Sequence, residues 1–329
     1  MTSPARLSRV MNMLALLAFC AAAGVAQAAE LAYPTRPVRL VVGFPPGGGT
    51  DVMARLISPK LNVAMGQTWV VDNRTGAGGN MAVEIVALAN PDGHTALLAL
   101  DTQLTANPML YKLPFSVEKD LQPITMLAST DMMLIVHPSV PAKTLKELVA
   151  LAKQKPGTLN FASAGMGSVV HLTSELLKKR AGIDVVHVPY KGGGPAATAV
   201  LAGEAQVLLG TVASALPFIE AGRLRALANT AAKRSKWLPD LPTVAESGYP
   251  GFDARIWYAL FVPGATPKSI AERIRGEVLK ALQYADVQAA MDRQGLVLET
   301  STPAELAARI KRETGTWAGI IKDAQIRVQ

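Results

Sequence analysis

The sequence predicts an α/β protein of two lobes with a ligand cleft between them. Strand-like runs of β-branched residues alternate with helical stretches, which is typical of parallel sheets covered by helices. Two apolar extended segments, at residues 132–137 and 256–262, divide the chain into outer parts and a middle part of similar size. Removing residues 1–28 from the 329-residue chain leaves 301 residues, more than one compact domain usually holds.

The amino-terminal segment has the features of a secretory signal peptide. Arg6 and Arg9 precede an apolar run from residue 10 to 25, and the small-x-small pattern that ends at Ala28 follows. A membrane anchor is the alternative, but the run is about 15 residues against the roughly 20 that span a bilayer. We therefore expect residues 1–28 to be removed and the mature protein to lie in the periplasm.

The single cysteine, Cys20, falls within the predicted signal peptide. The mature chain is thus expected to hold neither a disulfide nor a thiolate site. Lipoprotein cleavage before Cys20 is another possible route, which the bulky Phe19 disfavours.

Each element follows from its local pattern. In the first part we expect strands at 38–44, 68–72 and 95–100, helices at 51–65 and 81–90, and then a polar loop. In the middle part we expect strands at 134–137, 159–163, 185–188, 205–210 and 224–228, and helices at 145–153, 169–181 and 195–202. After a Pro/Gly-rich loop at 238–252, we expect a strand at 256–262 and amphipathic helices at 267–284 and 303–323.

The two apolar extended segments are interpreted as crossovers between the lobes. On this interpretation residues 29–132 and 257–329 form a discontinuous first lobe, and residues 133–256 form the second. The carboxy-terminal helices return to the first lobe, and ligands commonly bind in the cleft between two such lobes.

The net charge weakly favours an anionic partner. The chain carries a formal +8, and removal of Arg6 and Arg9 with the signal peptide leaves +6. Lysines and arginines spread over solvent-facing helices are the plainer source of this charge. Because the basic residues lack interleaved aromatics or a base-reading motif, we expect no nucleic-acid partner.

A glycine turn between the first strand and the first helix is the most informative motif. The strand that ends near Gly43 runs into a turn with the candidate ligand contacts Pro46, Gly47, Gly48, Thr50 and Asp51. Glycines let the backbone approach a ligand, and the start of a helix presents free N–H groups with a positive partial charge. Thr50 or Asp51 can also simply cap the helix.

A second turn of the same kind lies in the middle part and opens the helix that carries His171. Its candidate contacts are Ser163, Ala164, Gly165, Gly167 and Ser168. One such turn per lobe would aim two helix amino ends into one cleft, which suits a carboxylate. His171, one turn into its helix, is either a ligand contact or a packed structural residue.

Two further loops carry weaker signals. Thr102 and Gln103 follow the third strand, where a loop can reach the cleft. The glycine loop at 73–80 and the segment 188–195 are interpreted as turns, although Tyr190 or Lys191 of the latter can also face a ligand.

Enzyme signatures are missing from the sequence. No Gly-Lys-Ser/Thr completes a P-loop, no third glycine completes a dinucleotide fingerprint, and no G-x-S-x-G elbow occurs. The four histidines show no paired spacing for zinc. A serine hydrolase using Ser168 and His171 is the remaining enzyme alternative, without a visible third member. We predict no catalytic residue, no metal and no cofactor.

Taken together, these motifs resemble the Bug family, the TctC-like extracytoplasmic solute receptors of tripartite tricarboxylate transporters. The resemblance covers nearly the whole mature chain and is carried by residues 33–51, 73–80, 107–108, 163–171, 188–195 and 238–248.

The resemblance implies a type II periplasmic-binding-protein fold that delivers a small carboxylate to a permease of one large and one small membrane subunit. It also implies that backbone amides and hydroxyls of the two glycine turns hold the carboxylate. A receptor that opens and closes is expected to work as a monomer. The alternative partner is a membrane sensor kinase.

Departures from the family pattern bear on specificity. Ala199, Gln206 and the pair Gly210-Thr211 stand where many relatives are acidic, and Thr211 is a further candidate contact. Losing these carboxylates disfavours ligands with an ammonium group. We therefore expect a di- or tricarboxylate or an aromatic acid rather than an amino acid.

Overall fold

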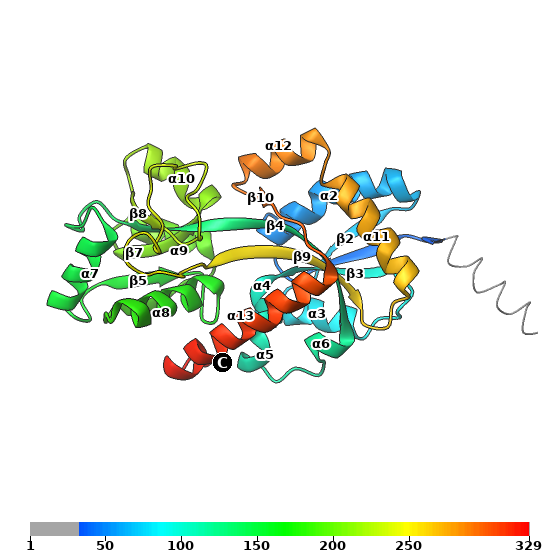
Figure 1. Cartoon of the computed structure of the whole chain (residues 1–329), viewed down its shortest axis with the longest axis horizontal. Coiled ribbons are helices and arrows are strands. Elements are labelled where there is room, and N and C mark those ends of the chain that lie inside the picture. The colour runs from blue at the N-terminus through cyan, green and yellow to red at the C-terminus, as the bar shows by residue number, and fades with distance from the viewer. Residues whose placement is uncertain (1–32, 329) are drawn as a thin grey trace, which may run out of the picture.

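The computed structural model describes residues 33–328. The predicted signal peptide and its cleavage near Ala28 lie outside this range. The described chain has the α/β architecture expected from the sequence, with two sheets that share one long strand and are covered by helices (Figure 1).

The first sheet has the strand order β2-β1-β3-β9-β4. Its parallel strands are β1 (Val38–Val42), β2 (Trp69–Asn73) and β3 (Thr95–Leu100), and its antiparallel strands are β9 (Arg255–Pro263), β4 (Leu121–Val136) and β10 (Val297–Leu298). The long helices packed on this sheet are α2 (Gly49–Met65), α3 (Asn80–Ala87), α11 (Lys268–Ala281), α12 (Ala285–Arg293) and α13 (Pro303–Asp323). Short helices are η1 (Ala77–Gly79), α4 (Asp101–Thr105), α5 (Asn107–Leu110) and α6 (Val117–Asp120).

The second sheet continues from the far end of β4. Its other strands are β7 (Val207–Thr211), β5 (Asn160–Ser163), β6 (Val186–Pro189) and β8 (Arg225–Asn229). Its helices are α7 (Leu145–Gln154), α8 (Val169–Ala181), α9 (Gly193–Leu201) and α10 (Val212–Glu220). Since β5 is parallel to both β6 and β7, the turns that follow these strands open at the same edge of the sheet.

Strand β4 changes sheets between Asp131 and Met132. Asp131 pairs with Arg255 of β9, whereas Met132 pairs with Thr211 of β7. The predicted boundary at residues 132 and 133 falls beside this point and stays an interpretation. The strand is longer than the predicted 134–137 because polar residues interrupt its apolar pattern, and tertiary contacts satisfy them. The hydroxyls of Thr125 and Thr130 donate to the carbonyls of Ser301 and Gly295.

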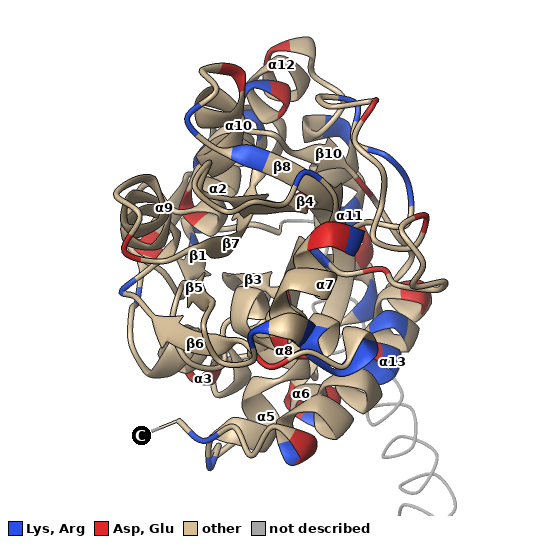
Figure 2. Ribbon diagram, turned by 90° about the vertical axis from the view of Figure 1, so that its left-hand side faces the viewer, with Lys and Arg blue, Asp and Glu red and all other residues tan. Residues whose placement is uncertain are grey.

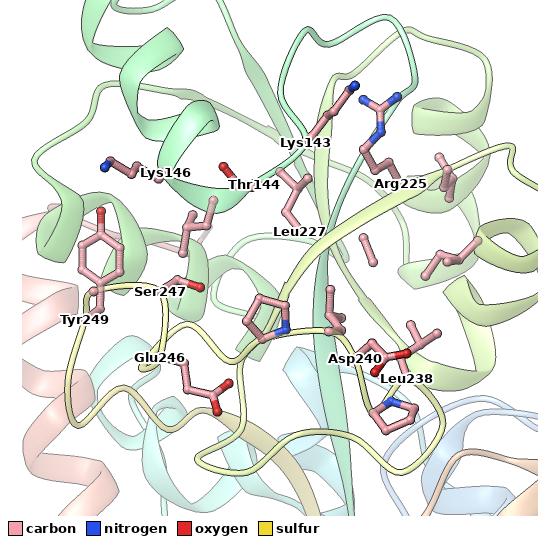
Figure 3. A pocket seen from close by; sticks show the side chains of 18 residues that line it. Lys143, Thr144, Lys146, Arg225, Leu227, Leu238, Asp240, Glu246, Ser247 and Tyr249 are labelled. Carbon is pink, nitrogen blue, oxygen red and sulfur yellow. The ribbon is translucent and has the colours of Figure 1, made fainter.

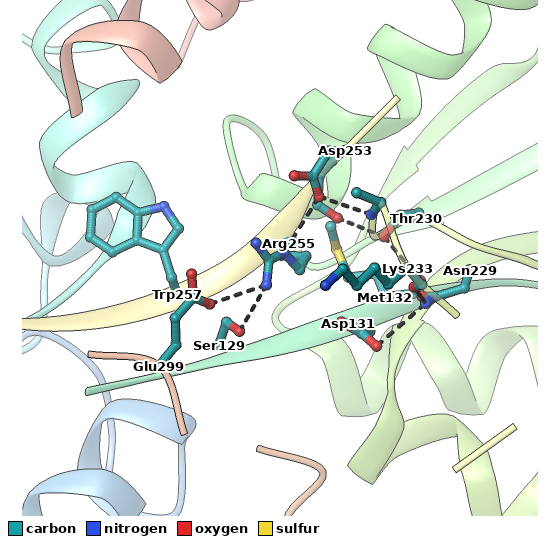
Figure 4. A network of polar contacts seen from close by, with 12 residues as sticks. Ser129, Asp131, Met132, Asn229, Thr230, Lys233, Asp253, Arg255, Trp257 and Glu299 are labelled. Atoms are coloured by element: carbon teal, nitrogen blue, oxygen red, sulfur yellow. Dashed lines mark hydrogen bonds and ion pairs between the residues drawn. The ribbon is translucent and has the colours of Figure 1, made fainter. Parts of the chain in front are cut away.

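A polar network ties the two crossing strands together (Figure 4). The Arg255 guanidinium on β9 donates to Ser129 Oγ on β4 at 3.3 Å and to Glu299 at 3.1 Å. The Thr230 hydroxyl donates to the carbonyls of Met132 and Ala254. These contacts hold the crossing strands in register where the chain passes between the lobes.

Helix α2 shows why the amphipathic pattern predicted its position. Its buried side chains include Met53, Ile57, Leu61 and Met65, spaced so that one face packs on the sheet.

Three other elements differ from expectation. The polar loop after β3 contains α4, and two helices were not predicted: α10, which contains Pro217, and α12, which follows α11 in place of a loop.

Within residues 33–328, no helix is both long enough and apolar enough to cross a membrane.

Candidate functional site

A cavity of about 400 Å³ lies between the two lobes. The first lobe contributes the turn before α2, Thr130 of β4 and Tyr258 of β9. The second contributes Ala164, the start of α9 and the segment from β7 into α10. A volume of this size suits a small metabolite.

The amino end of α2 forms one wall through Gly47, Gly48 and Gly49. Gly47 has a φ of +85°, a left-handed conformation that favours glycine, and its N–H donates to Asp51 Oδ2 at 2.9 Å. Asp51 also accepts from Arg55 and Asn73, both at 3.0 Å. Burial by itself would raise the pKa of Asp51, but these hydrogen bonds hold that pKa below its ordinary value. Asp51 therefore braces the turn from behind, as a charged cap does.

Two helix amino ends of the second lobe form the opposite wall. Gly193 and Gly194 begin α9, and Thr211 caps α10 by accepting from Ser214 N. Together with α2, three helices of nine residues or more point their amino ends at one cavity. Each amino end carries unpaired N–H groups and a positive partial charge.

Among residues 33–328, no charged side chain lines this cavity. The remaining wall is largely apolar, with Val52, Val170, Leu208, Leu209 and Leu296, and its neutral polar side chains include Thr130 and Gln294. Lysine, arginine and acidic residues lie instead on outer helices such as α7, α8 and α13 and on the loops (Figure 2). The positive potential of the cavity thus comes from helix ends and from neutral donors.

The structure brings some of the predicted contacts to the cavity and places others behind it. Gly47, Gly48, Ala164 and Thr211 line it. The other predicted residues do not line it: Pro46, Thr50, Asp51, Thr102, Gln103, Ser163, Gly165, Gly167, Ser168 and His171. Any role of the predicted residues in contacting a ligand stays a prediction.

His171 is packed into the second turn. Its Nδ1 accepts from Gly167 N at 3.1 Å, and its ring stacks on His187 with the ring centroids 3.7 Å apart. His187 in turn pairs with Ser163 Oγ at 2.6 Å. Burial lowers the pKa of both histidines to about 4, so both are neutral at pH 7.

Ser168 acts as the cap of α8. Its hydroxyl donates to the carbonyl of Gly165 at 2.7 Å and accepts from the backbone N–H of His171 at 3.3 Å. The His171 ring bonds to Gly167 N and not to this hydroxyl. The arrangement is that of a capped helix start rather than of a nucleophile and its base.

Thr102 and Gln103 lie in the buried helix α4, beneath the first lobe's glycine loops. Gln103 Nε2 donates to the carbonyl of Gly79 at 2.7 Å, and its Oε1 accepts from Leu100 N at 2.7 Å. The neighbouring Asp101 is buried, and this burial raises its pKa to about 8. These residues support the loops and do not face the cavity.

Tyr258, Thr130, Ser214 and the pair Gly193-Gly194 line the cavity but were not among the predicted contacts. The sequence predicts residues 256–262 as an apolar crossover strand and does not single out Tyr258 as a contact. A tyrosine in an apolar segment that crosses between two lobes is the sequence feature that could have indicated a contact with the cavity.

A larger cavity of about 1210 Å³ lies in the second lobe alone, between β8, the start of α7 and the loop 238–249 (Figure 3). Lys143, Lys146 and Arg225 border it together with Asp240 and Glu246. Charges of both signs therefore surround this cavity. Because the first lobe contributes nothing to its lining, a movement of the lobes would not enclose a ligand there.

No group of three or more His, Cys, Asp or Glu side chains that could hold a metal ion occurs in the described part of the chain.

Comparison with known proteins agrees with this architecture. The family model described as "Tripartite tricarboxylate transporter family receptor" matches residues 53–326. Protein BugT of Bordetella pertussis is 36% identical over 326 residues, which cover 97% of this chain and 100% of BugT.

Two solved structures from Rhodopseudomonas palustris have the same fold. Rpa4515 with adipate is 32% identical with a TM-score of 0.80, covering 90% of this chain and 99% of that one. MatC with bound malate is also 32% identical, with a TM-score of 0.77 over 88% of this chain and 100% of MatC. The chain therefore belongs to the family of receptors of tripartite tricarboxylate transporters, whose members are solute-binding proteins.

Proposed function

We propose that the protein captures a small carboxylate in the cavity between its lobes and delivers it to the membrane subunits of a tripartite transporter. One observation carries the ligand class: three helix amino ends from two lobes meet at a cavity that no charged side chain of the described residues lines. Such an environment stabilises an anion through backbone N–H groups. The adipate and malate bound to the two relatives support the same class.

The lining also bears on which carboxylates fit. An ammonium group would find no carboxylate partner in the cavity, while the apolar wall suits a hydrocarbon chain or ring. Of the departures from the family pattern, Gly210 and Thr211 line the cavity, whereas Ala199 and Gln206 do not. A di- or tricarboxylate or an aromatic acid is therefore preferred over an amino acid, and the preference rests on Gly210 and Thr211.

Export to the periplasm and binding without catalysis complete the proposal. Residues 1–28 carry the features of a signal peptide. The hydroxyl of Ser168, the nucleophile of the hydrolase alternative, is used to cap α8. The lobes, residues 29–132 with 257–329 and residues 133–256, would close on the ligand by a movement about β4 and β9, in a monomer.

A thermal-shift panel of carboxylates, amino acids and aromatic acids tests the proposal. Ligand binding to the folded state raises the Tm by mass action, so we expect a rise with one class of carboxylate. Gly194→Leu should abolish that rise. Gly194 lines the cavity at the start of α9, and a Cβ there would meet no atom within 4 Å apart from its chain neighbours, so the new side chain finds open space at the cavity wall.

Gly315→Leu is the matched control, because Gly315 is an exposed glycine in α13 with equally open surroundings. It should keep the ligand response. A panel without any carboxylate response, or an unchanged response in Gly194→Leu, would contradict the proposal.

A further inference from the structure

Tyr258 is a polar side chain of the cavity that lies on a crossover strand and caps no helix. Its residue is 6% exposed, on the face of β9 that lines the cavity. Trp257 and Ala259 point to the opposite face and pack in a different core cluster. Since side chains alternate along a strand, Tyr258 is directed toward α2 and the space between the lobes.

The Tyr258 hydroxyl lies beside the first residue of α2. A Cβ built on Gly49 would be 2.1 Å from the Tyr258 oxygen, so only a glycine fits at this position. Gly47, Gly48 and Gly49 line the cavity at the same place. The hydroxyl and the free N–H groups of the α2 amino end therefore border one region of the cavity.

The hydroxyl has no hydrogen-bond partner among residues 33–328. Burial and the neighbouring Asp101 raise the pKa of Tyr258, and no hydrogen bond contributes to that shift. The phenol thus remains a neutral donor across the physiological range. The Tyr258 oxygen is not fully buried and can be reached from the cavity, so a ligand oxygen at this point can accept its hydrogen bond.

We propose that the Tyr258 hydroxyl donates a hydrogen bond to the ligand carboxylate at the amino end of α2 and so fixes the orientation of the ligand. The inference rests on the proposed carboxylate binding and adds a phenol donor to the backbone N–H groups and cap hydroxyls of the site. Because a phenol donates along one direction, it discriminates between carboxylates by the placement of that group.

Calorimetry with adipate and malate as probes tests this inference on the wild-type protein, Tyr258→Phe and Tyr284→Phe. Tyr258→Phe removes one oxygen and keeps the packed ring, and it should weaken binding roughly ten- to a hundredfold, as expected for a lost hydrogen bond to a charged group. Tyr284 is half exposed and lies outside the cavity lining, so its variant should bind as the wild type does.

A spectroscopic readout separates hydrogen bonding from a general structural effect. A phenol that donates to an anion absorbs at longer wavelength in the near ultraviolet. Ligand addition should therefore produce a tyrosine difference spectrum in the wild type and in Tyr284→Phe that is missing in Tyr258→Phe at saturating ligand.

The outcomes are distinguishable. If Tyr258→Phe binds both acids as tightly as the wild type does, the hydroxyl pairs with water and the inference is overturned, while the proposed function stands. If the wild type binds neither acid nor any other carboxylate of the panel, the proposed function itself fails, and the inference fails with it.

Discussion

Asp101 shows how burial changes the chemistry of a single residue. It accepts hydrogen bonds from the N–H groups of Thr102 and Trp257, yet burial and the nearby Glu313 raise its pKa to about 8. A carboxyl whose pKa is higher in the folded protein stabilises the fold fully below the unfolded pKa, near 4. That contribution is lost as the pH rises from about 4 through 8.

We expect Asp101→Asn to remove this pH dependence. The free energy of unfolding of the wild type minus that of Asp101→Asn should fall between pH 5 and pH 8 by at most about 1.4 kcal/mol per pH unit. Urea unfolding at several pH values measures this difference. Asp184→Asn, at an exposed position, is the control and should give a flat difference. A flat profile for Asp101→Asn would show that its carboxyl is already ionised at pH 5.

His171 and His187 change the pH dependence of stability in the direction opposite to Asp101. Their pKa values are lowered to about 4 by burial, so their contribution is present above the unfolded pKa near 6.5 and is lost as the pH falls through 4. The pH profile of the wild type therefore combines opposing slopes between about pH 4 and 6.5. The contribution of Asp101 can therefore be separated from that of the histidines only by comparing the free energy of unfolding of the wild type with that of each variant.

At the scale of the element, the turn before α2 depends on one carboxylate. Asp51 binds Gly47 N, Arg55 and Asn73, and it is 3% exposed. The loop that lines the cavity is therefore held by a side chain that does not itself line it. Asp51 and Gly47 lie in the same short motif, so the sequence alone does not show which of them contacts a ligand and which supports the turn.

We expect Asp51→Ala to lower the free energy of unfolding by about 1.5–3 kcal/mol, as for lost hydrogen bonds to a charged group. It should also weaken carboxylate binding roughly tenfold, because the Gly47 turn loses its anchor. Calorimetry and urea unfolding measure both effects. Arg55→Ala is the matched control. It leaves the bonds to Gly47 and Asn73 in place and removes a pair whose arginine is 56% exposed, so its effects should be smaller. Equal effects of the two variants would contradict the anchoring role.

At the scale of the whole molecule, helix α13 connects the two lobes at a distance from the cavity lining. Trp317, Ile320 and Ile321 of α13 pack with Leu172 of α8 and Ala106 of the first lobe. Lys179 of α8 also pairs with Asp323 of α13. Both side chains of this pair are about half exposed, so it contributes at most about 1 kcal/mol, and the apolar packing dominates the contact.

We expect Trp317→Ala to lower the free energy of unfolding by about 3 kcal/mol, because it leaves a cavity in this contact, whereas Lys179→Ala should cost less than about 1 kcal/mol. Urea unfolding of both variants gives the comparison. A Trp317→Ala variant as stable as Lys179→Ala would show that α13 does not stabilise the lobes through this contact.

Local sequence patterns are enough to predict the α/β class, the order of most elements and the two glycine turns. These features depend on local patterns: the period of β-branched runs, the apolar face of α2, and glycine at positions such as Gly47 that need a left-handed backbone. The ends of α8 and α13 agree with expectation for the same reason, since Ser168 and Thr302 cap their first turns.

Which residues face the cavity depends on long-range packing and could not be predicted from the sequence. Thr211 and Ala164 line it, while Ser168, His171 and Gln103 turn their polar atoms to neighbouring backbone behind it. The full extent of β4 and the direction of Tyr258 also depend on long-range packing, because partners far apart in the sequence satisfy the polar atoms of β4 and determine which face of β9 meets α2. Local pattern specifies how a segment folds, but the surface that a side chain meets depends on distant segments that packing brings together.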